Sequence, residues 1–236
     1  QLAESFNEML DKIEGLIGKE YEIQLLLHQA EYNALQAQIN PHFLYNTLDT
    51  MSSIADIQGC RQVAALCQSL SNIFRYSLDI KHPFSTVAKE IMHLKNYIYV
   101  MNVRMQDNIE YHFDIDDTVL KEAIPRISIQ PIVENALNHG LRNVKGKKQV
   151  EICARDKGDD IEIIVKDNGV GMSKEKIDTL LKNTDGGTTR GKSIGINNIH
   201  MRLRMLYGEQ YGIKIESEIN VGTTVTLKVP KKRVEE

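Results

Sequence analysis

An apolar residue recurs at alternating steps of four and three through the first 55 residues, and this period constrains the fold more than any other feature. The series runs from Leu2 to Ala55, with Glu20 and Pro41 as its two interruptions. A period of 3.5 residues sustained this long predicts a coiled-coil seam or the core stripe of a helix bundle. A single amphipathic helix packed on its own domain is the alternative, and the length of the seam disfavours it.

Two more helices follow the seam. After the break at Gly59 a second amphipathic segment ends before Pro83, because proline disfavours helix in the residue that precedes it. A third segment begins at Ser85 or Thr86, which are good N-cap residues. Residues 1–107 therefore offer three or four helices, enough for a helical hairpin that pairs with a copy of itself.

The pattern changes after residue 107. Helical patterns cover 127–141 and 196–207, and alternation of apolar and polar residues predicts half-buried strands at 109–115, 150–155, 161–166, 213–219 and 224–229. Of the 15 glycines, those before residue 140 are Gly15, Gly18 and Gly59, so the second half is the glycine-rich one. Because the strands form local pairs, we expect an α+β fold with one mixed sheet and helices on one face.

The composition excludes several classes of protein. A net charge of −3 gives no electrostatic argument for a nucleic-acid binder. Three scattered cysteines suit neither a disulfide framework nor a zinc site, and no apolar run is long enough to cross a bilayer. The chain begins with Gln1 instead of Met and the seam is already running at Leu2, so we expect a fragment whose first helix enters from upstream.

The strongest helix contains a proline followed by a histidine. Pro41 in a helix interior would cost about 3 kcal/mol, so the position suggests a functional reason. His42 falls one step past the seam and points outward, and Asn46 lies one turn on, where its amide can reach the imidazole. An exposed imidazole can accept a transferred group. An ordinary surface histidine beside a tolerated kink is the alternative, and spacing alone slightly favours it.

Three polar clusters lie between the elements of the second half. In the first, on a helix, Asn135 sits between apolar neighbours, and its amide oxygen would suit Mg²⁺. In the second, Asp167 ends a strand and can accept a hydrogen bond from an exocyclic amine such as that of adenine. A hairpin turn explains this second cluster equally well, because Asp-Asn-Gly is also turn chemistry. In the third, glycines from 186 to 195 lead into a helix and form a potential phosphate cradle, with 173–190 as a lid.

In this order and spacing the clusters resemble the motifs of the GHKL ATPases, the family of gyrase B, Hsp90, MutL and the histidine kinases. Residues 134–139 look like the N box, 167–171 closely match the G1 box, and 191–195 look like the G2 box. Residues 38–48 are very similar to the phosphoacceptor segment of LytS/YesM-type sensor histidine kinases. The resemblance implies an all-α dimerising helical hairpin or coiled coil, followed by an α+β, Bergerat-type ATP-binding sandwich.

The resemblance also implies a role for each matching residue. His42 would accept the γ-phosphoryl group of ATP, Asn135 would hold Mg²⁺, and Asp167 would read the adenine amino group. The other implied contacts are Gly169 and Gly171 at the ring, Gly191 and Gly195 at the phosphates, and Asn138, His139 and Thr223 nearby.

Two positions depart from the family pattern and leave the general base open. Ser193 stands where many G2 boxes have glycine, and Phe43 occupies a position that is acidic in many histidine kinases. Glu134 is the candidate base, with Asn46 as the partner of His42, although a helix-capping or salt-bridge role fits Glu134 equally well.

The sequence thus predicts three parts: a signalling coiled-coil helix over 1–29, a dimerisation and histidine-phosphotransfer domain over 30–107, and a catalytic ATP-binding domain over 108–236. The implied function is the cytoplasmic catalytic part of a two-component sensor kinase that phosphorylates itself and then a response-regulator aspartate. We expect a homodimer, no nucleic-acid partner, and a bacterial parent protein anchored in the cell membrane upstream of residue 1. The alternatives are a GHKL ATPase or serine kinase whose helices only dimerise, and a degenerate dimer that binds ATP as a switch.

Overall fold

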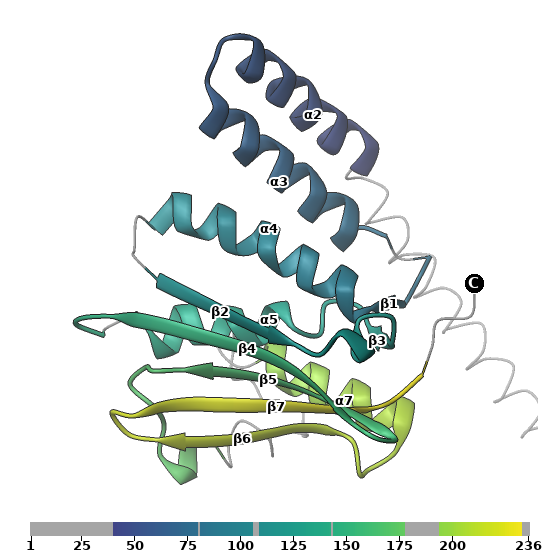
Figure 1. Ribbon diagram of the computed structural model, residues 1–236, viewed down its shortest axis with the longest axis vertical. Coiled ribbons are helices and arrows are strands. Elements are labelled where there is room, and N and C mark those ends of the chain that lie inside the picture. The colour runs from purple at the N-terminus through teal and green to yellow at the C-terminus, as the bar shows by residue number, and fades with distance from the viewer. Residues whose placement is uncertain (1–39, 80, 106–108, 143, 178–193, 233–236) are drawn as a thin grey trace, which may run out of the picture.

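The computed structural model describes residues 40–79, 81–105, 109–142, 144–177 and 194–232. Most of the predicted seam, from Leu2 to Ala37, lies outside these residues, as does Gly191. Figure 1 shows a helical hairpin at one end of the molecule and a five-stranded sheet at the other. Among the described residues, no helix combines the length and the apolar character needed to cross a membrane.

The hairpin consists of α2 (Pro41–Ile57) and α3 (Arg61–Ser77), joined by a turn in which Gly59 has a φ of +74°. Helix α2 begins at Pro41, because Asn40 has an extended backbone and its side chain accepts a hydrogen bond from the Phe43 amide (3.1 Å). Pro41 is therefore the first helical residue, where its missing N–H breaks no bond. The expectation that Pro41 lies inside a helix was wrong.

Small residues bring the two helices of the hairpin together. Ala55 of α2 and Ala64 of α3 are buried, and Ser52 donates to the Ala64 carbonyl (2.9 Å). Nearer the open end, Arg75 donates to Asp49 (2.9 Å). The long apolar side chains of α2 are thus left largely outside this contact.

The next segment joins the hairpin to the sheet. Strand β1 (Phe84–Thr86) pairs antiparallel with β3 (Ala123–Pro125), a small sheet that the sequence did not predict. Thr86 accepts a hydrogen bond from the Lys89 amide (3.3 Å), which confirms it as a cap for α4 (Val87–Met105). Helix α4 lies between α3 and the sheet in Figure 1, and its Leu94 is fully buried in the same apolar core as the strands. This helix packs with the α/β part, although the division at residue 107 assigned it to the helical part.

The five-stranded sheet is mixed, as predicted. Strand β2 (Ile109–Ile115), which is followed by the one-turn 3₁₀ helix η1 (Asp117–Val119), is parallel to its neighbour, and the other pairs are antiparallel. The order is β2-β4-β5-β7-β6, with β4 (Lys148–Lys157), β5 (Asp160–Asp167), β7 (Gly222–Pro230) and β6 (Gly212–Glu218). Alternate residues such as Ile161, Ile163 and Val165 are buried, and those between them are more exposed, so one face carries the core.

Two helical segments cover the core face. Helix α5 (Gln130–Asn135) continues directly into the π-helical segment η2 (Ala136–Gly140), and α7 (Ile194–Tyr207) packs beside them. The predicted helix over 127–141 is therefore shorter and changes its winding halfway. An α+β fold with helices on one face of the sheet is confirmed.

Candidate active site

The buried carboxylate of Asp167 is the centre of the candidate nucleotide site. Asp167 ends β5 on the core face, is 6% exposed, and accepts a hydrogen bond from the Gly169 amide (2.8 Å). Burial raises the pKa of this carboxyl above its usual range, and the backbone N–H groups of Gly169 and Thr223 partly offset that effect. A carboxylate has about four acceptor positions, so Asp167 retains capacity for a further donor such as an exocyclic amine.

Glycines surround Asp167 because the backbone approaches it closely. A Cβ at Gly140 would lie 2.8 Å from Asp167 Oδ1, and one at Gly169 would lie 2.4 Å from the Gly140 carbonyl oxygen. Gly171 has a φ of +65°, and a Cβ there would lie 1.9 Å from the Glu218 carbonyl oxygen. The end of η2, the loop after β5 and the β6–β7 hairpin thus meet around one carboxylate. Sequence reasoning missed Gly140, and its position just after the N-box residues was the available signal.

Thr223 lies opposite Asp167 on the neighbouring strand, and its hydroxyl is already engaged. Ser217 donates its one proton to the Gly222 carbonyl (2.8 Å), so the 2.9 Å contact between the Ser217 and Thr223 hydroxyls is a donation from Thr223. Ser217 also accepts from the Met172 amide (2.8 Å). The Ser217 hydroxyl therefore joins the loop after β5 to the β6–β7 hairpin, and the Thr223 hydroxyl donates to it from within the hairpin.

Asn135 lies in the middle of the covering helix, with its amide oriented by the protein. Its amide nitrogen donates to the Pro131 carbonyl (2.6 Å), so the amide oxygen is the atom that could accept a cation. At the start of the same helix, a Cβ at Gly195 would lie 3.4 Å from Pro131 Cβ, so the beginning of α7 lies against the beginning of α5. Gly195 of α7 thus lies near the Pro131 end of this helical segment, and Asp167 of β5 lies near its Gly140 end. At 1.5 Å per residue, Pro131 and Gly140 are separated by roughly 13 Å along the segment.

The side chain of Glu134 is held by two neighbours that sequence reasoning did not identify. Gln130 donates to Glu134 Oε1 (2.8 Å), and the Tyr97 hydroxyl is hydrogen-bonded to the same carboxylate. Burial and this carboxylate raise the pKa of Tyr97, so its hydroxyl keeps its proton and donates. Asn138 and His139 on the following turn are exposed.

His42 is exposed near the start of α2, with Asn46 one turn along. The amide nitrogen of Asn46 lies 3.0 Å from Nε2 and 3.3 Å from Nδ1, so the predicted reach of this amide to the ring is present. The Tyr45 ring meets the imidazole edge-on, with 5.5 Å between centroids. In Figure 1, α3 and α4 lie between the sheet, whose strand β5 ends at Asp167, and α2, which carries His42.

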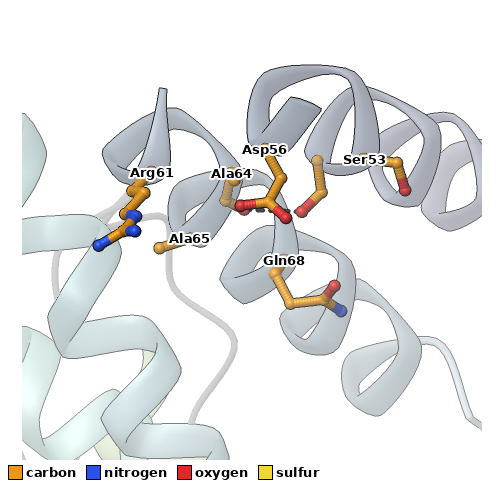
Figure 2. A pocket seen from close by; sticks show the side chains of 7 residues that line it. Ser53, Asp56, Arg61, Ala64, Ala65 and Gln68 are labelled. Atoms are coloured by element: carbon orange, nitrogen blue, oxygen red, sulfur yellow. Dashed lines mark hydrogen bonds between the residues drawn. The ribbon is translucent and has the colours of Figure 1, made fainter. Parts of the chain in front are cut away.

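A surface hollow lies near the tip of the hairpin. Figure 2 shows Ser53 and Asp56 from α2 and Arg61 and Gln68 from α3 around it. None of the predicted nucleotide or phosphoacceptor residues that the structure describes lines this hollow, so it is separate from the candidate active site.

Two family models match the chain. Residues 30–109 match the family described as "Histidine kinase", and residues 125–233 match the "Histidine kinase-, DNA gyrase B-, and HSP90-like ATPase" family. Among solved structures, the catalytic domain of histidine kinase ThkA aligns with a TM-score of 0.48 and 16% identity, covering 63% of this chain and 95% of that one.

Curated relatives match almost the entire chain. Sensor histidine kinase YesM of Bacillus subtilis (strain 168) is 32% identical over 225 residues, which cover 95% of this chain and 37% of the relative. Sensor histidine kinase YpdA of Escherichia coli (strain K12) is 34% identical over 242 residues, which cover 99% and 41%. Sensor protein LytS of Bacillus anthracis is 34% identical over 214 residues, which cover 89% and 36%. The chain thus spans about two fifths of the length of these relatives.

Proposed function

The chain belongs to the sensor histidine kinases, and from this premise we propose that it transfers the γ-phosphoryl group of ATP to its own His42 and then to an aspartate of a response regulator. The ATPase family matched by residues 125–233 implies ATP binding. The observation that carries the proposal is the buried Asp167 carboxylate, held by two backbone N–H groups at one end of the helix that bears Asn135.

The geometry supports one orientation of the nucleotide. Asp167 would accept the adenine amino group beside Gly169 and Gly171, because it is buried and has acceptor capacity left. The phosphates would then lie toward the start of α7, where Gly195 opens the helix and backbone N–H groups attract anions. Asn138, His139 and Gly191 are further proposed contacts. The separation of roughly 13 Å along the helix suits a ligand with an aromatic ring at one end and a triphosphate at the other.

Asn135 would hold Mg²⁺ through its amide oxygen. The donor set fits this ion, because Mg²⁺ takes hard oxygen ligands and is commonly held by one or two protein groups together with phosphate oxygens. The bond from Asn135 to the Pro131 carbonyl fixes the amide so that oxygen is the atom presented. When bound, the ion neutralises charge on the phosphates.

His42 would act as the nucleophile. A nitrogen of the neutral imidazole forms a bond to the γ-phosphorus while the bond to the bridging oxygen breaks, so ADP leaves with that electron pair. The other ring N–H then loses its proton. Asn46 orients the ring, because a half-turn of its amide presents either a donor or an acceptor to the ring nitrogens. Glu134 remains the proposed base, oriented by Gln130 and Tyr97.

We propose a homodimer formed through the hairpin. One face of α2 is apolar and exposed, and its side chains fall within roughly one third of the helix circumference. The exposed fractions are Phe43 64%, Met51 50%, Ile54 52% and Ile57 87%. His42 lies roughly 120° around the helix from the centre of this face, so a dimer that buries the face leaves the imidazole accessible.

The proposed organisation keeps three functional parts. Residues 1–29 would carry the signal as a coiled coil, 30–107 would dimerise and carry His42, and 108–236 would bind ATP together with α4. A membrane anchor upstream of residue 1 in the parent protein completes the proposal, and it would place this part in the cytoplasm.

Phosphate mapping after incubation with Mg-ATP tests the proposal. We expect acid-labile phosphate on His42 and no label on the His42→Gln variant. His112→Gln is the matched control, because His112 is an exposed histidine of β2 and its loss should leave labelling unchanged. Label that persists in His42→Gln refutes the assignment, and acid-stable phosphate on another protein indicates a serine kinase.

A further inference from the structure

A buried carboxylate lies between the hairpin and the nucleotide helix. Glu90 of α4 is 1% exposed and accepts hydrogen bonds from the amides of Ile127 (2.7 Å), Ser128 (2.9 Å) and Ile129 (3.3 Å). The hydroxyl of Tyr76, from the last turn of α3, donates to the same carboxylate. Four donors on two oxygens compensate the burial of the charge.

The loop held by Glu90 leads directly into the helix that bears Glu134 and Asn135. Ile127 in this loop has a φ of +54°, a strained conformation for a β-branched residue, so its surroundings must hold it there. Arg202 of α7 donates to Ser128 Oγ and to the carbonyl of Arg126, both at 2.9 Å. The start of α5 is thus fixed from α4 and α7 together.

Tyr76 connects the hairpin both to α4 and to this loop. Its ring stacks on His93 with 4.3 Å between centroids, and the Arg126 guanidinium lies 3.9 Å from the ring centroid. Burial raises the pKa of Tyr76, so the hydroxyl remains protonated and donates to Glu90. Arg126 also donates to the Tyr76 carbonyl and to Asp79 (3.0 Å), which ties the end of α3 to the same loop.

A second route leads from Tyr76 to Glu134 through side chains. His93 Nε2 lies 2.5 Å from Gln130 Oε1, and Gln130 donates to Glu134. His93 is 3% exposed, and within the described part of the chain its Nδ1 is buried with no hydrogen-bond partner. A buried nitrogen without a hydrogen-bond partner costs free energy, so a second arrangement of the network that pairs this nitrogen would be favoured.

We propose that Tyr76 is a positioning residue that couples the orientation of the phosphoacceptor hairpin to the nucleotide helix through Glu90 and His93. A movement of α3 changes the donor that Tyr76 supplies to Glu90, which shifts the strained loop and the start of α5. Nucleotide binding at α5 is coupled back to α3 by the same contacts, because coupling between two sites is reciprocal. The inference rests on the proposed function, since it concerns the regulation of that same site.

The Tyr76→Phe variant separates coupling from folding. It removes the hydroxyl donor but keeps the ring stacked between His93 and Arg126. Glu90 retains its three backbone donors, so the loop and the fold should persist. Tyr99→Phe is the matched control, because it makes the same chemical change on α4 outside this network.

Hydrogen exchange of the full 236-residue chain with and without Mg-ADP tests the proposal. In the unchanged protein we expect added protection both at residues 130–140 and at residues 70–78. In Tyr76→Phe we expect protection at 130–140 alone, with a nucleotide Kd within about twofold and a His42 phosphorylation rate changed at least about fivefold, the lower end of typical coupling. Tyr99→Phe should behave like the unchanged protein.

The outcomes distinguish the two proposals. If Mg-ADP protects neither segment, the proposed nucleotide site fails and the coupling fails with it. Mg-ADP that protects residues 130–140 but also protects residues 70–78 in Tyr76→Phe overturns only the role of Tyr76. Protection of residues 130–140 with no protection of residues 70–78 in either protein has the same meaning. Changes of equal size in nucleotide affinity and phosphorylation rate overturn it as well, because a purely structural defect weakens binding and slows phosphorylation together.

Discussion

Substituting Gly140 by alanine tests whether the Asp167 carboxylate is the nucleotide contact. Gly140 ends η2 and its φ lies outside the positive range, so alanine adopts this backbone without strain and gains up to about 1 kcal/mol in helix propensity. The added Cβ would lie 2.8 Å from Asp167 Oδ1 and 3.2 Å from Oδ2. The carboxylate must therefore move by roughly 0.6 Å to reach an ordinary contact distance.

That movement weakens the hydrogen bond that orients the Asp167 carboxylate. Oδ1 is the atom that accepts the Gly169 N–H at 2.8 Å. A hydrogen bond to a charged group contributes about 1.5–3 kcal/mol, so misplacing the carboxylate should weaken nucleotide binding roughly 10- to 100-fold. The gain in helix propensity offsets part of the loss in the unliganded protein, so the free energy of unfolding should change by less than about 2 kcal/mol.

Calorimetric titration with a non-hydrolysable Mg-ATP analogue, together with thermal unfolding, measures both effects. Gly158→Ala is the control, because Gly158 has a φ of +80° and a Cβ there meets nothing within 4 Å. That variant should lose about 1–2 kcal/mol of stability through backbone strain and bind nucleotide normally. A folded Gly140→Ala protein that binds the analogue within twofold of the unchanged chain would refute the reasoning.

Three further substitutions test other parts of the site. Asn135→Ala should remove the Mg²⁺ dependence of nucleotide affinity, measured with and without the ion, whereas Asn96→Ala, which also loses an amide bonded to a carbonyl four residues back, should not. Asp167→Asn should abolish binding yet melt no lower at pH 7. Burial raises the pKa of Asp167 in the folded protein, so the stabilisation present below its unfolded pKa is lost as the pH rises. The difference in melting temperature between the unchanged protein and Asp167→Asn should therefore vanish near pH 4. Leu94→Ala should cost about 2–5 kcal/mol of the stability of the nucleotide-binding unit, and Met92→Ala, on the exposed side of α4, should cost almost nothing; equal melting curves contradict the packing of α4 with the sheet.

Local sequence patterns predicted most of the helices and strands, and the error at Pro41 shows the limit of such patterns. The seam continues in register through Pro41, so periodicity alone extended one helix across it. The dipeptide Asn40-Pro41 nevertheless has the two residues preferred at the N-cap and first helical position, and this local signal identifies the start of α2. Periodicity likewise predicted the helix that is α4 but could not say against which element its buried side chains, such as Leu94, pack, because an apolar stripe fixes a face and not its partner.

The candidate site also has features that local sequence patterns predict and features that they do not. Asp167, Gly169 and Asn135 could be predicted because their spacing along the chain resembles known motifs. The contact from Tyr97 to Glu134 could not, since Tyr97 lies on α4 and only the packing of α4 on α5 brings it to Glu134, whereas Gln130 lies one turn before Glu134 on the same helix. Buried polar networks depend on tertiary contacts, so no local pattern announces them.

The distance between His42 and Asp167 has a consequence for the proposed reaction. Transfer needs the γ-phosphate beside the imidazole, yet α3 and α4 separate the two sites in Figure 1. The contacts that join α3 to the loop before α5, around Tyr76 and Arg126, are polar, whereas α4 shares a continuous apolar core with the sheet. A rearrangement there would bring the nucleotide to His42 of the same chain, whereas an unchanged joint requires His42 of a second copy. Mixing nucleotide-binding-deficient Asp167→Asn chains with His42→Gln chains distinguishes these: label on the Asp167→Asn chain indicates transfer between copies, and its absence indicates movement within one chain.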